Sequence, residues 1–306
     1  MQNRNYGIEL YRCLLMWGIC LLHSISQGIY KLSWAENGLL FCVDGFIFIT
    51  GYYGASFKWS KIIKLYGTAL YTGTLVVGWG FLQGYFDGMT QIAIAKSLKR
   101  VYLDAWFLNG YIVVLFFAPM IEKVLSSRNW TKILLPLLVL VFGWSFLRSG
   151  PIGGVMPDSA GVGAYSGITL LGVYVCGRIA RKCEQSFSFK HGQLVLAGVG
   201  SLLICLLGFG SYASPFAVVV AMCLFYLFKQ VKQTAKREIF GKMVNLIAPS
   251  LFSVYLLHSN VIGFNLIKDV ERGGGKSAIL LNDRTCYMFV VRCAKKSCRI
   301  LCMAAK

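Results

Sequence analysis

The sequence predicts an all-α protein, a bundle of membrane-spanning helices. Hydrophobic residues fill 57% of the 306 positions, and the mean hydropathy is +0.62. Soluble domains contain about 45–50% apolar residues even when glycine is counted. In this chain the apolar residues gather in stretches close to the ~20 residues that a helix needs to cross a bilayer. The composition therefore excludes a soluble globular domain and indicates a polytopic membrane protein with about nine or ten spans.

The candidate spans follow one another along the chain. Hydropathy places nine of them at 8–30, 38–56, 63–86, 106–122, 132–148, 164–180, 193–211, 213–230 and 246–267. A tenth, at 279–294, is marginal because Asp283 and Arg284 interrupt it. We therefore expect a membrane domain over 1–268, followed at 269–306 by a poorly specified basic tail or a marginal last span.

Basic residues in alternate loops predict the orientation. The N-terminus and the loops near 57–62, 123–131, 181–192 and 231–243 hold sixteen lysines and arginines with their flanks, and the opposite loops hold five up to the ninth span. Lys and Arg concentrate on the cytoplasmic side, so the N-terminus is predicted to be cytoplasmic. The same bias accounts for the net charge of +19 without a nucleic-acid partner.

Two connections differ from simple short loops. Residues 87–104 are mildly amphipathic and are expected to lie along the outer surface. The loop from Arg148 to Gly163 is rich in glycine, and it either shapes an entrance for a substrate or is simply a mobile outer loop.

The eleven cysteines are interpreted as small buried hydrophobic residues. No pair has Cys-x-x-Cys spacing, and the chain has only three histidines. No metal site is therefore predicted. The cysteines inside apolar stretches are Cys13, Cys20, Cys42, Cys176, Cys205 and Cys223.

The first span carries an arginine and a histidine on one face. Arg12 and His23 are eleven positions apart, so on a helix they project within ~20° of each other and lie ~16 Å apart along the axis. Ionisable side chains are rare in lipid and usually mark a reactive site or a pathway. Glu9 stands three residues before Arg12, so that the two could instead form a simple neutralising pair.

Two further motifs lie near the two ends of the predicted bundle. The second span reads Cys-Val-Asp44-Gly-Phe-Ile-Phe-Ile-Thr50-Gly51-Tyr-Tyr and buries one carboxylate. The ninth reads Ser253-Val-Tyr255-Leu-Leu-His258. Counting ~1.5 Å per residue places His23, Asp44 and His258 in the outer half of a ~30 Å core, which permits them to meet.

These motifs, in this order, resemble the acyltransferase-3 family of integral-membrane enzymes that acylate hydroxyl groups. The resemblance covers roughly residues 4–268 and rests on Arg12-x10-His23, on Asp44 with Gly51, and on Tyr255-Leu-Leu-His258. It implies an acyl-coenzyme A donor, usually acetyl-CoA, as a substrate and not as a permanently bound cofactor. The sequence departs from the family at Thr50, where serine is usual.

The resemblance and the chemistry together assign roles. His23 is the predicted general base that takes the proton of a hydroxyl group. Asp44 is predicted to hold its imidazole and stabilise the cation, as a carboxylate does in hydrolase triads. Arg12 is predicted to hold the anionic donor or to stabilise developing negative charge.

The donor site is predicted to include the basic loop before the third span. Lys58, Lys61 and Lys64 occupy a position where the family has a loop richer in arginine. Lysine presents a point charge and lacks the planar fork of arginine, so these residues predict phosphate contacts that are not bidentate.

Several residues are predicted to support the site. His258 either packs or takes part in catalysis, and Tyr255 and Ser253 accompany it. Trp106, at the start of the fourth span, is either an anchor at the membrane interface or a platform for the substrate.

The expected partners are the bilayer, the acyl-CoA and a glycan or lipid-linked saccharide acceptor, on a multi-pass protein of the cell membrane, in bacteria the cytoplasmic membrane. The competing interpretation is a transporter in which His23, Asp44 and Arg12 form a proton or substrate path. No inverted repeat or pair of broken helices supports it. The identity of the acceptor is not encoded in any motif of the sequence.

Overall fold

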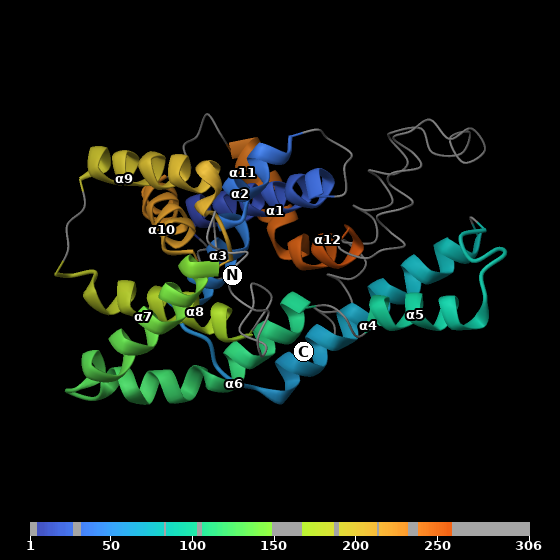
Figure 1. The fold of residues 1–306 in the computed structure, drawn as a ribbon, viewed down its shortest axis with the longest axis horizontal. Coiled ribbons are helices and arrows are strands. Elements are labelled where there is room, and N and C mark those ends of the chain that lie inside the picture. Colours follow the sequence, from blue (N-terminus) through green and yellow to red (C-terminus); the bar gives the residue numbers. More distant parts are fainter. Residues whose placement is uncertain are drawn as a thin grey trace. The chain divides into compact units, whose positions relative to one another are not determined.

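The computed structural model describes residues 5–26, 32–82, 84–102, 106–148, 167–186, 190–212, 214–231 and 238–258. Every regular element in these residues is a helix (Figure 1). The principal helices are α1 (Tyr6–Ser26), α2 (Ser33–Leu39), α3 (Phe41–Tyr53), α4 (Trp59–Leu82), α5 (Gln91–Tyr102), α6 (Trp106–Ser126), α7 (Trp130–Arg148), α8 (Gly167–Cys183), α9 (His191–Ile204), α10 (Pro215–Lys229), α11 (Glu238–Ile247) and α12 (Leu251–His258). The predicted all-α class is confirmed.

Several of these helices have the composition of membrane spans. By length and hydropathy, three stretches of the described chain can cross a membrane: Tyr6–Ser26, Gln91–Ser126, which contains α5 and α6, and His191–Phe209. Two shorter apolar helices, Trp130–Trp144 and Pro215–Lys229, accompany them. This set of helices is that of a polytopic membrane bundle.

Each of the nine predicted spans overlaps with a described helix, but the bounds differ. The stretch 38–56 is divided, because α2 ends at Leu39 and α3 begins at Phe41. The amphipathic stretch 87–104 contains α5. The marginal span at 279–294 and the tail at 269–306 lie outside the described residues.

The helices fall into two compact units. The first contains α1 to α3, α6 to α10 and most of α11. The second contains α4, α5 and α12. The predicted base and its neighbours belong to the first unit, and the lysine-rich loop and the His258 motif belong to the second.

The first unit is centred on the crossing of α3 with α8. A Cβ atom added at Gly51 would lie 2.2 Å from the Tyr174 carbonyl oxygen, and one added at Gly177 would lie 2.4 Å from the carbonyl oxygen of Phe48. Both distances are backbone clashes, so that only glycine permits the approach. Small residues allow helix backbones to pack closely in membranes, where packing drives association.

Helices α1 and α3 run antiparallel where they pack against each other. Gly18 meets Cys42, whereas Gly45 meets Leu15 and the Tyr11 hydroxyl group. The Tyr11 hydroxyl group donates a hydrogen bond of 3.0 Å to the carbonyl oxygen of Ala221 in α10. Helix α1 is thereby held between α3 and α10.

Local sequence explains how two of these helices begin and end. Helix α3 stops at Gly54, which has φ 81° and donates its N–H to the Gly51 carbonyl oxygen at 3.1 Å. That conformation favours glycine. Helix α10 begins with Pro215, whose fixed φ and missing N–H suit the first turn.

The second unit has its own small core. Val76 and Val77 of α4, Phe86 of the turn after α4 and Val101 of α5 are buried together, and Leu257 of α12 packs against them. The apolar face of the amphipathic stretch is therefore turned toward α4.

Candidate active site

Arg12 and His23 both lie on the continuous helix α1, as predicted. Arg12 forms an ion pair with Glu9, 3.1 Å from Nη1 to Oε2. The Glu9 side chain is 9% exposed and that of Arg12 is 33% exposed. A buried carboxylate needs a partner, because an unpaired charge in a low dielectric is strongly destabilising. The neutralising pair considered from the sequence is therefore present, and any contact of Arg12 with a substrate is additional to it.

His23 lies in the last turn of α1 and is half-buried. Its carbonyl oxygen accepts a hydrogen bond of 3.1 Å from Ser26 Oγ. By helix geometry its Cα is ~16 Å along the axis from that of Arg12. The histidine and the arginine are therefore at the two ends of one helix face.

Asp44 is completely buried. Its carboxyl group lies within electrostatic range of Tyr11, Cys42, Cys176 and Cys205. These residues come from α1, α3, α8 and the π-helical turn Cys205–Phe209 that follows α9. Asp44 is thus at the point where several elements of the first unit converge.

The neighbours of Asp44 in α3 pack against a part of α1 that is nearer the start of α1 than His23 is. The next residue, Gly45, contacts Leu15 and Tyr11, and Cys42 contacts Gly18. His23 is eight residues beyond Leu15, about 12 Å along the helix. The role of Asp44 as the support of His23 stays a prediction from the sequence.

A charged cluster joins the ends of α3, α8 and α10. Tyr52 donates a hydrogen bond of 2.5 Å to Glu184 Oε2, and Arg181 Nη1 donates to the same oxygen at 2.7 Å. Lys229 donates to the other oxygen of Glu184 and, at 2.5 Å, to the Tyr52 hydroxyl group. Burial alone would raise the pKa of the Glu184 carboxyl, but hydrogen bonds from Lys229, Tyr52 and Arg181 outweigh it and lower the pKa below its ordinary value.

Neighbouring contacts place further helix ends beside this cluster. Arg178 donates a hydrogen bond of 2.7 Å to Glu122 Oε2 near the end of α6. Asn5, just before α1, donates to the Lys229 carbonyl oxygen at 3.4 Å. Lys182 donates to the Leu125 carbonyl oxygen. The start of α1 and the ends of α3, α6, α8 and α10 therefore share one end of the first unit, which we call the basic end.

The sequence analysis did not identify this charged cluster. A signal was available, because the chain has only twelve acidic residues. Glu122 and Glu184 each lie close to the end of an apolar stretch, beside basic residues. Acidic residues at such positions indicate ion pairs between helix ends.

The predicted donor lysines lie at the start of α4 in the second unit. Lys58 precedes the helix, and Lys61 and Lys64 occupy its first two turns. The Lys58 carbonyl oxygen accepts the first backbone hydrogen bonds of α4. Lys58 and Lys64 are exposed, so that their charges are accessible at the N-terminus of a helix, where the helix dipole favours anions.

The remaining predicted residues are placed as follows. Tyr255 is buried in α12 and Ser253 is half-buried. The side chain of His258 lies outside the described residues. Trp106 begins α6 and packs against Tyr212, with 5.2 Å between ring centroids. The two interpretations of Trp106 both fit this contact.

Some of the cysteines in apolar stretches are buried, as the sequence predicts, and others are half-buried. Cys42, Cys205 and Cys223 are buried, and Cys13, Cys20 and Cys176 are half-buried. Within the described part of the chain, no group of three or more His, Cys, Asp or Glu residues could hold a metal ion.

Comparison with protein families decides the assignment. A family model described as an acyltransferase domain, that of acyltransferase-3, matches residues 5–267. This chain belongs to the acyltransferase-3 family. No curated protein and no solved structure matches the sequence.

Membership of the acyltransferase-3 family identifies the chain as a membrane acyltransferase. The resemblance inferred from the three motifs is confirmed. The family also decides between the two function classes considered from the sequence, because it assigns acyl transfer and not transport.

Proposed function

We propose that this acyltransferase moves an acyl group, normally acetyl, from acyl-coenzyme A to a hydroxyl group of a cell-envelope polysaccharide or a related glycan. The observation that carries the proposal is α1, which has Arg12 near the basic end and His23 on the same face in its last turn. A cation that can hold an anionic donor and a base for the acceptor are thus ~16 Å apart on one helix.

The reaction begins with proton removal from the acceptor. The His23 imidazole takes the proton of the glycan hydroxyl group as its oxygen forms a bond to the thioester carbonyl carbon. The tetrahedral intermediate then expels the coenzyme A thiolate, which receives the proton from the imidazolium. The products are the acyl ester and free coenzyme A, and His23 is neutral again.

Asp44 supports this step through its charge. Even at a separation on the order of 10 Å, an ionised carboxylate would stabilise the imidazolium by roughly 1–2 kcal/mol at an effective dielectric constant of 20. That energy corresponds to about tenfold in rate. A direct hydrogen bond of the triad type would contribute far more.

The donor contacts are those that the sequence predicts. Lys58 and Lys64 supply exposed positive charge for the phosphate groups of coenzyme A, and Lys61 is half-buried. Arg12 contributes a planar guanidinium group, part of which remains exposed beside Glu9.

The membrane orientation completes the proposal. The basic end of the first unit gathers the helix ends that precede or follow the lysine- and arginine-rich loops. We assign this end to the cytoplasm, where acyl-CoA is available, in a multi-pass protein of the cell membrane. An acceptor on the outer side would then reach His23 from the opposite end of α1.

The test is a transfer assay with membrane vesicles and radiolabelled acetyl-CoA, with the label followed into purified glycan fractions. His23→Ala should lower the transfer rate by about 10²–10⁴ at unchanged protein abundance, because general base catalysis contributes that much. His191→Ala is the matched control, since His191 is an exposed histidine at the start of α9. Normal transfer by a well-expressed His23→Ala protein would overturn the assignment.

A further inference from the structure

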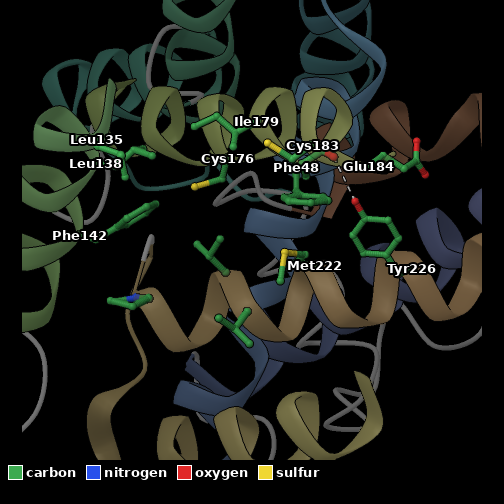
Figure 2. Close-up of a pocket in the computed structure, with 14 residues that line it drawn as sticks. Phe48, Leu135, Leu138, Phe142, Cys176, Ile179, Cys183, Glu184, Met222 and Tyr226 are labelled. Carbon is green, nitrogen blue, oxygen red and sulfur yellow. Dashed lines mark hydrogen bonds between the residues drawn. The ribbon is translucent and has the colours of Figure 1, made fainter. Parts of the chain in front are cut away.

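A cavity lies between α7, α8 and α10 in the first unit (Figure 2). Its volume is about 420 Å³, which is in the range of pockets that hold small ligands. The walls carry apolar side chains from all three helices, including Leu135, Leu138, Phe142, Cys176, Ile179 and Met222. None of the residues proposed for acyl transfer lines it.

The cavity has the length of one membrane leaflet. Along α10 its lining extends from Pro215 to Tyr226, a helix length of about 16 Å. The hydrocarbon core of a bilayer is ~30 Å thick, so that one leaflet accounts for ~15 Å. A lipid chain lying parallel to α10 would therefore fit the cavity from end to end.

One end of the cavity is polar and positively charged. Glu184 and Tyr226 line that end, where Figure 2 shows them at the edge of an otherwise apolar wall. Arg181 and Lys229 both bind the Glu184 carboxylate, and Lys182 follows Arg181 directly. These three cations outnumber the single carboxylate, and the Arg181 side chain is 56% exposed.

We propose that the cavity binds one acyl chain of an anionic phospholipid from the leaflet at the basic end. The chain lies against the apolar walls, and the phosphate of the headgroup contacts Arg181 and Lys229. Basic pockets between membrane helices on the cytoplasmic side commonly bind anionic headgroups. The lipid fills the space between α7 and α10 and does not take part in acyl transfer.

Native mass spectrometry of the purified, delipidated protein tests the headgroup contact. The probes are palmitoyl-oleoyl phosphatidylglycerol and the matched phosphatidylcholine. Phosphatidylglycerol should bind with one preferred equivalent, and Arg181→Gln with Lys229→Gln should weaken that binding by about 10- to 30-fold. The control removes two exposed cations elsewhere, Lys123→Gln with Arg128→Gln, and should keep the binding. Equal binding of the two lipids by the unaltered protein would contradict the proposal.

A second pair of variants tests the chain-binding walls. Met222→Trp places a larger side chain in the cavity and should abolish the preferred equivalent. Leu196→Trp adds the same side chain at a position on α9 that is 77% exposed and should leave binding unchanged. Retention of the lipid by a folded Met222→Trp protein would overturn the proposal.

The unaltered protein provides a test that does not depend on folding of a variant. Phosphatidylglycerol with a photoreactive group in its acyl chain should label peptides of α7, α8 and α10. Labelling confined to other helices would contradict the proposal. Displacement of the lipid by palmitoyl-CoA, but not by free coenzyme A, would assign the cavity to the acyl chain of the donor and would likewise overturn it.

Discussion

Helix α3 packs against α8 and against α1 in two different ways. At the α3–α8 crossing, each glycine faces a backbone carbonyl oxygen, which cannot move away as a side chain can. Gly177 faces the Phe48 carbonyl oxygen and Gly51 faces that of Tyr174. At the α1–α3 contact, glycine meets side chains, as where Gly45 faces Leu15. Helix α1, which carries the proposed base, therefore rests on a rigid helix pair through contacts that can adjust.

The largest effect is expected at the rigid crossing. Gly177→Ala puts a methyl group into the backbone of α3 and should destabilise the protein by more than about 3 kcal/mol, beyond ordinary overpacking. Gly45→Ala should cost about 1–3 kcal/mol, because side chains can move away. Gly143→Ala is the control, since its added Cβ meets no atom of the described residues within 4 Å beyond its chain neighbours and its own helix backbone, and it should be neutral or slightly stabilising. Thermal unfolding in detergent measures all three, and equal losses at Gly177 and Gly45 would remove the contrast.

The next effect concerns the ion pair on α1. Arg12→Gln leaves the buried Glu9 carboxylate without its partner and should destabilise the protein by about 2–4 kcal/mol, since Arg12 is one-third exposed. Arg12→Gln combined with Glu9→Gln should restore most of that stability. Transfer should stay low in the double variant if Arg12 also holds the donor. Full activity of a stable double variant would limit Arg12 to neutralising Glu9.

A smaller effect on rate is expected from Asp44→Asn. The change keeps the shape of the buried side chain and removes its charge, so that transfer should fall by about tenfold or more. The rate is to be measured at equal membrane abundance. Undiminished transfer by the Asp44→Asn protein would contradict the supporting role of Asp44.

The smallest effect is expected at the basic end. Glu184 has a pKa lowered in the folded protein, so its stabilising contribution is present above the unfolded pKa and is lost as the pH falls through the folded pKa. Glu184→Gln should cost roughly 1 kcal/mol at neutral pH, because the cluster is partly solvated. The difference in Tm from the unaltered protein should shrink below about pH 4. A difference independent of pH would contradict an ionic role.

Much of this fold follows from composition, because only helices satisfy their backbone groups in lipid. The order of the helices and the shared face of Arg12 and His23 were predictable from hydropathy and the 3.6-residue period. The register of α1 on α3 was not, since it depends on which glycines face side chains. Contacts such as that of Gly45 with Leu15 set this register.

The charged cluster shows a second limit of sequence analysis. Tyr52 is far in sequence from Arg181 and Glu184, and only the crossing of α3 with α8 brings it to them. Loop composition predicted a basic end, but the pairing of each acid with its cations needed the three-dimensional arrangement. The cavity between α7, α8 and α10 was likewise beyond any motif.

Chemical rescue tests the central claim, that the imidazole of His23 removes the acceptor proton. His23→Ala membranes are assayed for acetyl transfer from acetyl-CoA with and without added imidazole, beside His191→Ala and Arg12→Gln membranes. The proposal predicts that imidazole raises the rate of the His23→Ala protein severalfold and leaves the other two unchanged, because only the first has lost its proton acceptor. Undiminished transfer by the His23→Ala protein without imidazole would contradict the claim.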